Sequence, residues 1–205
     1  MEYLCCWTFS KGVAVNDLSP HYRMVVVGDL WSGKTSLIYR FTRGTLPGDD
    51  TQTVFDTDEV QIPIDNKKVY LTIRDTSGTE EDARIRALAY DSCDVILICF
   101  SVASPQSLHN VVSEWASEVH HLCKNVPYLL VGTHADLRDN SKLKRAEKEV
   151  KFISNKKGEQ TAKMIGAKGY FEFSALDERN AVKKSKFIFG RAVREVMKIR
   201  KTFGS

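Results

Sequence analysis

One stretch of the sequence combines residues that could bind phosphate. A glycine, four further residues and then Gly-Lys-Thr stand between an apolar run and a helical pattern. The stretch comprises Gly28, Asp29, Leu30, Trp31, Ser32, Gly33, Lys34 and Thr35, and Ser36 follows it. In such a loop the backbone N–H groups point at phosphate oxygens, at the positive end of the following helix. We expect Lys34 to place its charge beside the phosphates and Thr35 to offer its hydroxyl to Mg²⁺.

The elements that position this loop alternate between strand and helix patterns. Apolar runs predict strands at about 22–27, 60–64, 69–73, 94–100, 128–132 and 170–173. Helical patterns end at about 43, begin at 105, cover 139–157 and 158–165, and begin again at about 180. The alternation predicts an α/β fold, with a mostly parallel six-stranded sheet, helices on both faces and one antiparallel edge strand. Ligands of such sheets bind at the carboxyl ends of the strands, where the loop and Asp75 both fall.

The length of 205 residues predicts a single domain. We expect an N-terminal extension at 1–20, a domain at 21–201 with a lysine-rich helical insertion at about 139–157, and a tail at 202–205. In the helix that begins at 105, one face is expected to pack on the sheet. That face comprises Leu108, Val111, Val112, Trp115, Val119 and Leu122.

Composition excludes several classes of protein. The net charge of +4 is too small to indicate nucleic-acid binding, and no apolar run reaches the length of a membrane span. The N-terminus lacks the pattern of a secretory signal, and the five cysteines form no CxxC pair, which favours reduced thiols and a cytoplasmic location. Acylation of Cys5 or Cys6 remains an alternative to a plain tail.

Beyond the phosphate loop, four further motifs resemble those of small GTPases in the Ras superfamily, and specifically the Rho branch. They are Thr53-Val54-Phe55-Asp56, Asp75-Thr76-Ser77-Gly78, Thr133-His134-Ala135-Asp136 and Ser174-Ala175-Leu176. The resemblance covers about residues 22–200, and the insertion sits where Rho-type chains carry theirs. It implies GTP or GDP and Mg²⁺ as ligands, with the metal held by Thr35, by Thr53 and, through water, by Asp75. It also implies that Gly78 binds the γ-phosphate, that Asp136 reads guanine and that Thr133, His134 and the 174–176 loop line the base.

Two departures from the family pattern concern hydrolysis. Leu30 stands where the family usually has glycine, in the space that a catalytic glutamine and a partner's arginine finger need. Thr79 stands at the position of that glutamine, and its side chain is too short to orient water in the same way. We therefore expect hydrolysis to be nearly absent, unless a residue such as Glu80 replaces the glutamine.

Other departures concern nucleotide binding and exchange. Leu46 replaces an aromatic residue that stacks on guanine, and His134 replaces a lysine whose stem lies along the base. Asp50 replaces a tyrosine that closes over the phosphates, and Arg74 replaces a tryptophan that influences the choice of exchange factor. The sequence leaves open whether Trp31 covers the nucleotide or points outward.

These features favour an atypical Rho-type GTP-binding switch with little hydrolysis. The alternatives are an ordinary hydrolysing GTPase and an interaction module that has lost its nucleotide. Effectors are expected to bind at about 46–56 and 75–90, exchange factors are implied by the resemblance, and a monomer is expected. The C-terminal residues contain no cysteine for prenylation, and the basic final helix leaves peripheral membrane contact open.

Overall fold

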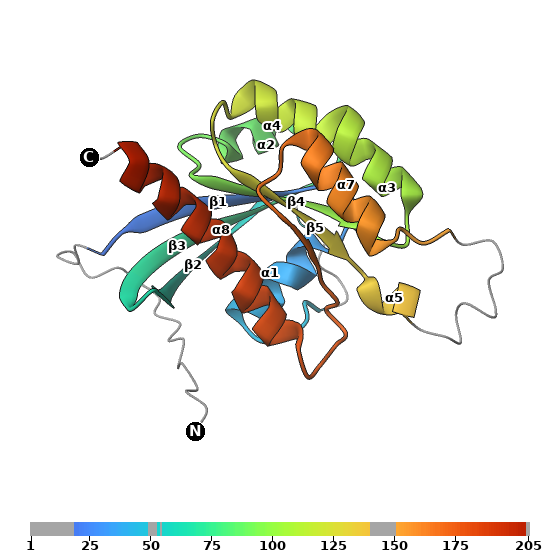
Figure 1. The fold of residues 1–205 in the computed structure, drawn as a ribbon, viewed down its shortest axis with the longest axis horizontal. Helices are drawn as coiled ribbons and strands as arrows, with labels where there is room; N and C mark the ends of the chain where they lie inside the picture. Colours follow the sequence, from blue (N-terminus) through green and yellow to red (C-terminus); the bar gives the residue numbers. More distant parts are fainter. Residues whose placement is uncertain (1–18, 49–52, 54, 140–150, 204–205) are drawn as a thin grey trace.

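The computed structural model describes residues 19–48, 53, 55–139 and 151–203, and it shows one sheet covered by helices (Figure 1). The strands are β1 His21–Val27, β2 Phe55–Ile64, β3 Lys67–Thr76, β4 Val95–Ser101, β5 Tyr128–Thr133 and β6 Tyr170–Glu172. Their order across the sheet is β2-β3-β1-β4-β5-β6. Among these strands only β2 and β3 pair in antiparallel fashion. The predicted sheet and its antiparallel edge are therefore confirmed.

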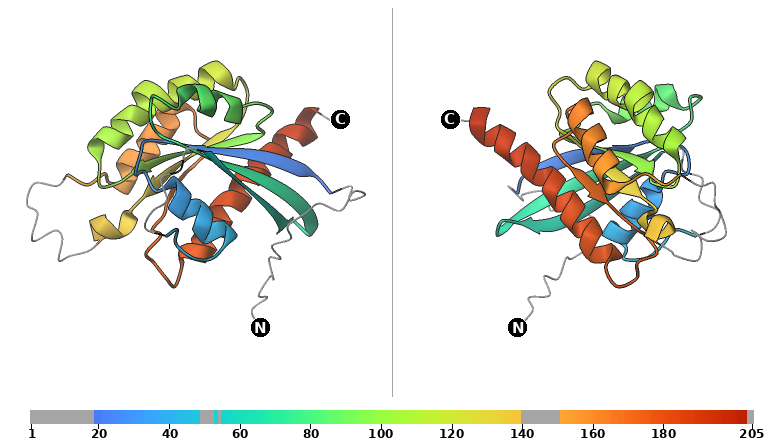
Figure 2. Two further views of the ribbon diagram at one scale, coloured as in Figure 1. Left: turned by 180° about the vertical axis from the view of Figure 1, so that it is seen from behind. Right: turned by 45° about the vertical axis from the view of Figure 1, so that its right-hand side comes forward.

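Helices pack on both faces of this sheet, as predicted. They are α1 Lys34–Thr42, α2 Ala83–Ala89, α3 Pro105–Asn110, the π-helical turn η1 Val111–Trp115, α4 Ala116–Leu122, α5 Ala135–Asp139, α7 Asn155–Ile165 and α8 Ala181–Phe203. Helices α1 and α8 cover one face, whereas α2, α3, α4 and α7 cover the other (Figures 1 and 2). The sheet is thus buried on both sides, which explains why the inner strands β4 and β5 are mostly apolar and almost fully buried.

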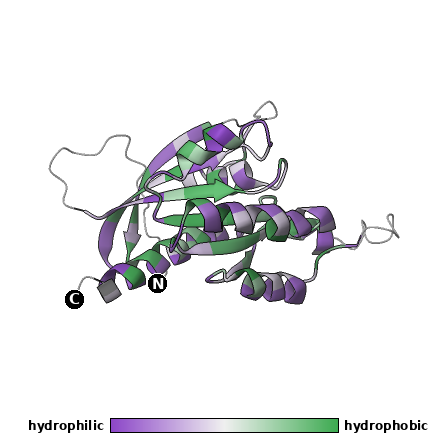
Figure 3. Ribbon diagram, turned by 90° about the horizontal axis from the view of Figure 1, so that it is seen from above, coloured by the Kyte–Doolittle hydropathy of each residue, from purple (hydrophilic) through white to green (hydrophobic). Residues whose placement is uncertain are grey.

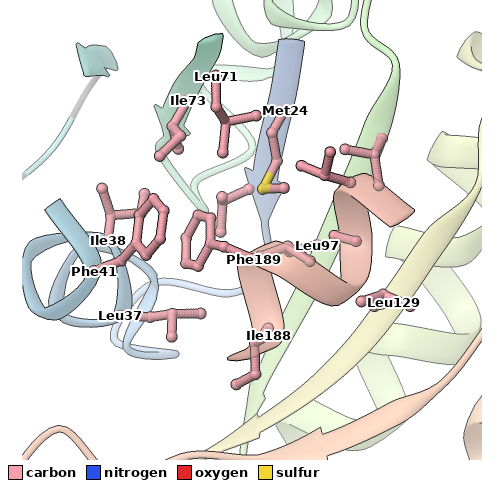
Figure 4. Close-up of a cluster of buried hydrophobic side chains, with 14 of the residues drawn as sticks. Met24, Leu37, Ile38, Phe41, Leu71, Ile73, Leu97, Leu129, Ile188 and Phe189 are labelled. Carbon is pink, nitrogen blue, oxygen red and sulfur yellow. The ribbon is translucent and has the colours of Figure 1, made fainter. Parts of the chain in front are cut away.

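Alternation along β1 shows how the two cores are separated. Met24 and Val26 face the core beneath α1 and α8, while Val25 and Val27 face the opposite core. In the first core Phe41 of α1 stacks on Phe189 of α8, with ring centroids 4.0 Å apart (Figure 4). The hydropathy view shows hydrophilic residues along the outer surfaces of the helices (Figure 3). This packing fixes α1, and with it the loop that precedes α1.

One part of the predicted helical face is wrong. Leu108, Val111, Trp115 and Val119 are buried, but Val112 is 41% exposed and Leu122 is 46% exposed. The π-helical turn η1 interrupts the regular helix between α3 and α4, so the buried stripe does not follow one 3.6-residue period. The turn leaves Trp115 buried against the second core.

The boundary of the predicted insertion helix also needs correction. Residues 140–150 lie outside the described part of the chain, and residues 151–154 form no helix. Helix α7 starts at Asn155 because Ser154 caps it, with its Oγ accepting from the backbone N–H of Lys157 at 3.2 Å. The segment 155–157 therefore belongs to the helix that was expected to begin at 158.

The remaining domain boundaries stay largely predictions. Residues 1–18 of the proposed extension, Asp50, Val54 and residues 204–205 of the tail lie outside the described residues. Helix α8 extends to Phe203, two residues past the expected end of the domain at 201. No helix in the described segments is long and apolar enough to cross a membrane.

Candidate functional site

A cavity of about 380 Å³ opens beside the phosphate loop, at the carboxyl end of the sheet. Thirteen of the predicted site residues line it: Leu30, Trp31, Gly33, Lys34, Thr35, Ser36, Leu46, Thr53, Gly78, His134, Asp136, Ala175 and Leu176. Four lining residues were not predicted, namely Pro47, Gly48, Thr76 and Ser77. Each of them lies one or two positions from a predicted residue in the sequence. Their proximity in the chain was therefore the signal that could have identified them. The structure thus brings residues from the stretches 30–36, 46–48, 53, 76–78, 134–136 and 175–176 to one cavity.

Gly28 is required by a close approach between two strands. Its φ is 140°, and a Cβ there would lie 2.1 Å from the carbonyl oxygen of Cys99 in β4. Any side chain would therefore separate β1 from β4 or force the loop away from the cavity. Gly28 does not itself line the cavity but sets the path of the loop that does.

Lys34 is held in place by the loop that it serves. Its Nζ donates to the carbonyl oxygens of Gly28 at 2.9 Å and Asp29 at 2.8 Å. Burial lowers the pKa of Lys34, and the nearby Asp75 carboxylate partly opposes that effect. The ammonium group is preorganised at the cavity wall, where an anion would compensate its charge.

Three oxygen-bearing side chains meet next to Lys34 and form a candidate metal corner. The Thr35 hydroxyl donates to Asp75 Oδ2 at 2.6 Å and lies 2.9 Å from the hydroxyl of Thr53. Burial raises the pKa of Asp75 to about 6, partly countered by the hydrogen bond from Thr35 and the charge of Lys34. Hydroxyl and carboxylate oxygens are the ligands that Mg²⁺ prefers.

Two buried oxygen atoms support the fit of phosphate and metal to this corner. Asp75 Oδ1 and Ser32 Oγ are buried without a hydrogen-bond partner among the described residues. Buried polar atoms normally have partners, and unpaired ones often mark the place of an ion or ordered water. A hydrated Mg²⁺ would satisfy the free oxygen of Asp75. The predicted residues Thr35, Thr53 and Asp75 therefore fit a magnesium site.

The wall expected to direct hydrolysis has a different character. Leu30 lines the cavity and is 38% exposed, whereas Thr79 is not among the lining residues. The Thr79 hydroxyl donates to Asp82 Oδ2 at 2.7 Å and lies 3.2 Å from Ser77 Oγ. Hydrogen bonds from Ser77 and Thr79 lower the pKa of Asp82. Thr79 is thus turned toward the start of α2 and not toward the cavity.

Gly78 is packed directly against the phosphate loop. A Cβ on Gly78 would lie 2.3 Å from both the carbonyl carbon of Asp29 and the backbone nitrogen of Leu30. A side chain at this position would push the two segments apart. Gly78 and Leu30 therefore form one continuous wall at the phosphate end of the cavity.

At the opposite end, the predicted base-reading residues divide into those that line the cavity and those that support it. His134 and Asp136 line it, and Ser174 donates to Asp136 Oδ1 at 2.5 Å. Thr133 does not line it; its hydroxyl lies 2.7 Å from the Ser32 carbonyl oxygen and joins β5 to the phosphate loop. Burial lowers the pKa of His134, with Asp136 opposing, so its imidazole is neutral at pH 7.

Trp31 projects outward from the rim. It is 80% exposed, has a φ of 61° and still borders the cavity. Arg74 also has a defined role, because its Nη1 donates to the carbonyl oxygens of Ala89 at 2.6 Å and Asp91 at 2.8 Å. It therefore caps the C-terminal end of α2.

Comparisons with known proteins agree with this geometry. A family model described as Ras family matches residues 23–198. The chain is 42% identical over 176 residues to the GTP-binding protein RHO1 of Candida albicans, a match that covers 85% of this chain and 83% of that protein.

Proposed function

The chain belongs to the Rho branch of the Ras family of small GTPases, and from this premise we propose that it holds GTP far better than it hydrolyses it. Members of this family bind GTP and GDP with Mg²⁺ and act as switches that bind effectors and exchange factors. The proposal rests on a contrast between two parts of the site. The side chains that fit phosphate and Mg²⁺ are present, whereas Leu30 and Thr79 replace the residues that the family uses near the site of hydrolysis.

The binding roles follow the positions of the side chains. We assign the phosphates to the loop backbone from Gly28 to Ser36, including Asp29, Ser32 and Gly33, and to Lys34. Mg²⁺, which neutralises phosphate charge when bound, is assigned to Thr35, Thr53 and, through water, Asp75. Guanine is assigned to Asp136, whose carboxylate accepts from base N–H groups, with Thr133, His134 and the loop Ser174, Ala175 and Leu176 around it.

The hydrolytic defect rests on two side chains. Thr79 lacks the reach of a glutamine, and its hydroxyl already donates to Asp82. Leu30 adds an aliphatic side chain at the wall formed with Gly78, which is the space that a partner's arginine finger would use. Loss of an arginine finger removes about 10³–10⁵ in rate in this reaction class. Both changes act on the same wall, so they reinforce each other.

Single-turnover hydrolysis of GTP tests the proposal. We expect the Leu30→Gly/Thr79→Gln double variant to hydrolyse at least about tenfold faster than the natural chain, since positioned water catalysis contributes about 10²–10⁴. Thr57→Gln, at an exposed position of β2, is the matched control and should leave the rate unchanged. A natural chain as fast as the double variant, or one strongly stimulated by a GTPase-activating protein, would contradict the proposal.

The two alternatives give different outcomes. An ordinary GTPase would hydrolyse GTP without the substitutions. An interaction module without nucleotide would release none on denaturation and would show no thermal shift with GTP. The ligand set at Lys34, Thr35 and Asp75 favours nucleotide binding over the second alternative.

Effector binding is proposed for the segments 46–56 and 75–90. Of these, residues 49–52 and 54 lie outside the described chain, while Phe55, Ile85 and Leu88 are 43%, 41% and 73% exposed. Exposed apolar side chains of this kind suit a protein partner. Cytoskeletal signalling, a monomeric state and a cytoplasmic location complete the proposal. Because Arg74 caps α2, we expect exchange factors that require an aromatic residue there to bind poorly.

A further inference from the structure

We propose that Trp115 is a positioning residue that joins the phosphate loop to the segment around Gly78, so that these two segments move together. The inference rests on the proposed nucleotide site. It assigns a role to the helical segment α3–η1–α4, which contributes no residue to the cavity lining.

The first half of the connection runs from Trp115 to the phosphate loop. The indole Nε1–H of Trp115 donates to Asp29 Oδ1 at 2.6 Å, and Asn110 Nδ2 donates to Asp29 Oδ2 at 3.0 Å. Hydrogen bonds to an ionised carboxylate are stronger than neutral ones. The carbonyl oxygen of Asp29 in turn accepts from Lys34, and its peptide with Leu30 is the surface on which Gly78 packs. Trp115 and Asn110 therefore fix the orientation of that peptide.

The second half runs from Trp115 to the segment around Gly78. The guanidinium of Arg86 lies over the Trp115 ring, 4.8 Å from its centroid. Arg86 Nη1 donates to the carbonyl oxygens of Ser77 at 3.1 Å and Thr79 at 2.9 Å. These two carbonyls flank Gly78 on either side. Arg86 therefore holds the backbone of this segment while it rests on Trp115.

Burial and charge hold the side chains of Arg86 and Trp115 in one geometry. Arg86 is 5% exposed and Trp115 is 4% exposed. A buried guanidinium requires partners, and Glu118 of α4 supplies two, at 2.8 Å to Nε and 2.9 Å to Nη2. Tyr90 adds a hydrogen bond to Glu118 at 2.6 Å. Displacing the segment around Gly78 would break the contacts of Arg86 with Glu118 and Trp115. These contacts therefore oppose movement of that segment.

The π-helical turn explains how one residue can serve both halves. In η1 the chain makes a wide turn that ends at Trp115, between the Asn110 end of α3 and the Glu118 turn of α4. The indole N–H thereby reaches Asp29 while the ring face remains under Arg86. Single π-helical turns within longer helices are frequent at functional sites.

A double-mutant cycle on nucleotide release tests the proposal. Trp115→Phe keeps a ring beneath Arg86 but removes the donor to Asp29, and Asp29→Ala removes the acceptor. We expect each single variant to release a fluorescent GDP analogue at least about fivefold faster, because Trp115→Phe loses one charge-assisted hydrogen bond and Asp29→Ala loses that bond and the one from Asn110. Because both remove the same contact, the double variant should be within about twofold of the faster single variant. Rates that multiply, or a Trp115→Phe rate within twofold of the natural chain, would overturn the proposal.

Amide hydrogen exchange provides a readout that does not require bound nucleotide. In Trp115→Phe we expect faster exchange at 28–34 and 77–82 together, with β5 unchanged. General loss of stability would raise exchange in β5 as well and would count against a positioning role. Val112→Ala, an exposed neighbour in the same turn, is the control and should leave both segments unchanged. If the chain bound no nucleotide, the release assay would give no signal and the proposed function would fail, while the exchange assay would still decide the role of Trp115.

Discussion

The two ends of the cavity differ in exposure: the phosphate end lies beside Lys34 and Asp75, and the base end lies beside Leu46 and Leu176. Lys34 and Asp75 are 6% and 4% exposed, whereas Leu46 and Leu176 are 39% and 63% exposed. The first pair belongs to a connected set of hydrogen bonds that includes the loop carbonyls and Thr35. The second pair consists of aliphatic side chains, and Asp136, which we propose binds guanine, accepts a hydrogen bond from Ser174. The phosphate end of the cavity is thus buried and hydrogen-bonded, whereas the base end is more exposed and partly aliphatic.

This difference indicates where affinity and selectivity arise. Charged contacts gain strength in a buried site because the local dielectric is low, so the phosphate end should supply most of the binding free energy. An exposed aliphatic rim gives the base little stacking energy, so the base end should select guanine while holding it loosely. The same contrast predicts tight phosphate contacts combined with comparatively rapid release.

The strongest way to break this contrast is Lys34→Ala. The substitution removes the ammonium group, which donates to the carbonyl oxygens of Gly28 and Asp29, and with it the charge-assisted contacts that we propose Lys34 makes with the phosphates. We expect GTP affinity to fall at least about 100-fold, because hydrogen bonds to charged groups contribute about 1.5–3 kcal/mol each. Titration with a fluorescent GTP analogue measures the change, with the exposed Lys156→Ala as control. An affinity within threefold of the natural chain would mean that the phosphate end does not dominate binding.

Leu46→Phe should strengthen the weaker end. An aromatic ring at the rim can stack on the base, which contributes about 1–3 kcal/mol in nucleic-acid binders. We therefore expect nucleotide release to slow about tenfold. Stopped-flow release measures this effect, and Leu122→Phe, at an exposed position of α4, controls for added aromatic surface. Unchanged release would show that Leu46 does not contact the base.

The sequence predicted the sheet, its order of elements and most of the cavity lining. These features depend on local patterns, such as the apolar run Val95–Phe100 and the glycine-bounded loop. Such patterns consist of residues that are adjacent in the sequence. The contact of Thr79 with Asp82 was not predictable in the same way, because it depends on how the loop before α2 folds. The outward direction of Trp31 likewise depends on a positive φ that the residue type does not suggest.

The π-helical turn and the start of α7 show a second limit. A period of 3.6 residues describes a regular helix, so it could not indicate that Val112 and Leu122 would be exposed. The start of α7 was missed because the lysine-rich pattern continues across Ser154, which the structure shows to be the N-cap of that helix. Arg86 was missed because its partners come from two separate segments, residues 77–79 and the helical segment with Trp115 and Glu118, which no local pattern brings together.

The neutral state of His134 offers a test of the base end through pH. Burial lowers the pKa of His134 in the folded chain, so the unfolded chain binds a proton first as the pH falls below about 6.5. Through this group the free energy of unfolding should decrease between pH 7.5 and 5.5, by at most about 1.4 kcal/mol per pH unit for one proton, while protonation of Asp75, whose raised pKa is about 6, acts in the opposite direction. His134→Gln should reduce that decrease, as measured by urea unfolding at both pH values. The exposed His121→Gln should retain it, and an equal loss in both variants would exclude a specific contribution from His134.

The substitution with the smallest expected effect tests whether GTP binding and GTP hydrolysis depend on different residues at the phosphate end. Asp82→Ala frees the Thr79 hydroxyl from its 2.7 Å hydrogen bond without lengthening the side chain. If the proposed defect in hydrolysis arises from side-chain length, the single-turnover rate should stay within about twofold, since a freed threonine still cannot position water as a glutamine does. If the defect arises from the engagement of Thr79 by Asp82, the rate should rise toward that of Leu30→Gly/Thr79→Gln. GTP affinity should be unchanged in either case, because Asp82 does not border the cavity. A fall in affinity would instead show that the start of α2 supports the phosphate end and that holding and cleaving cannot be separated there.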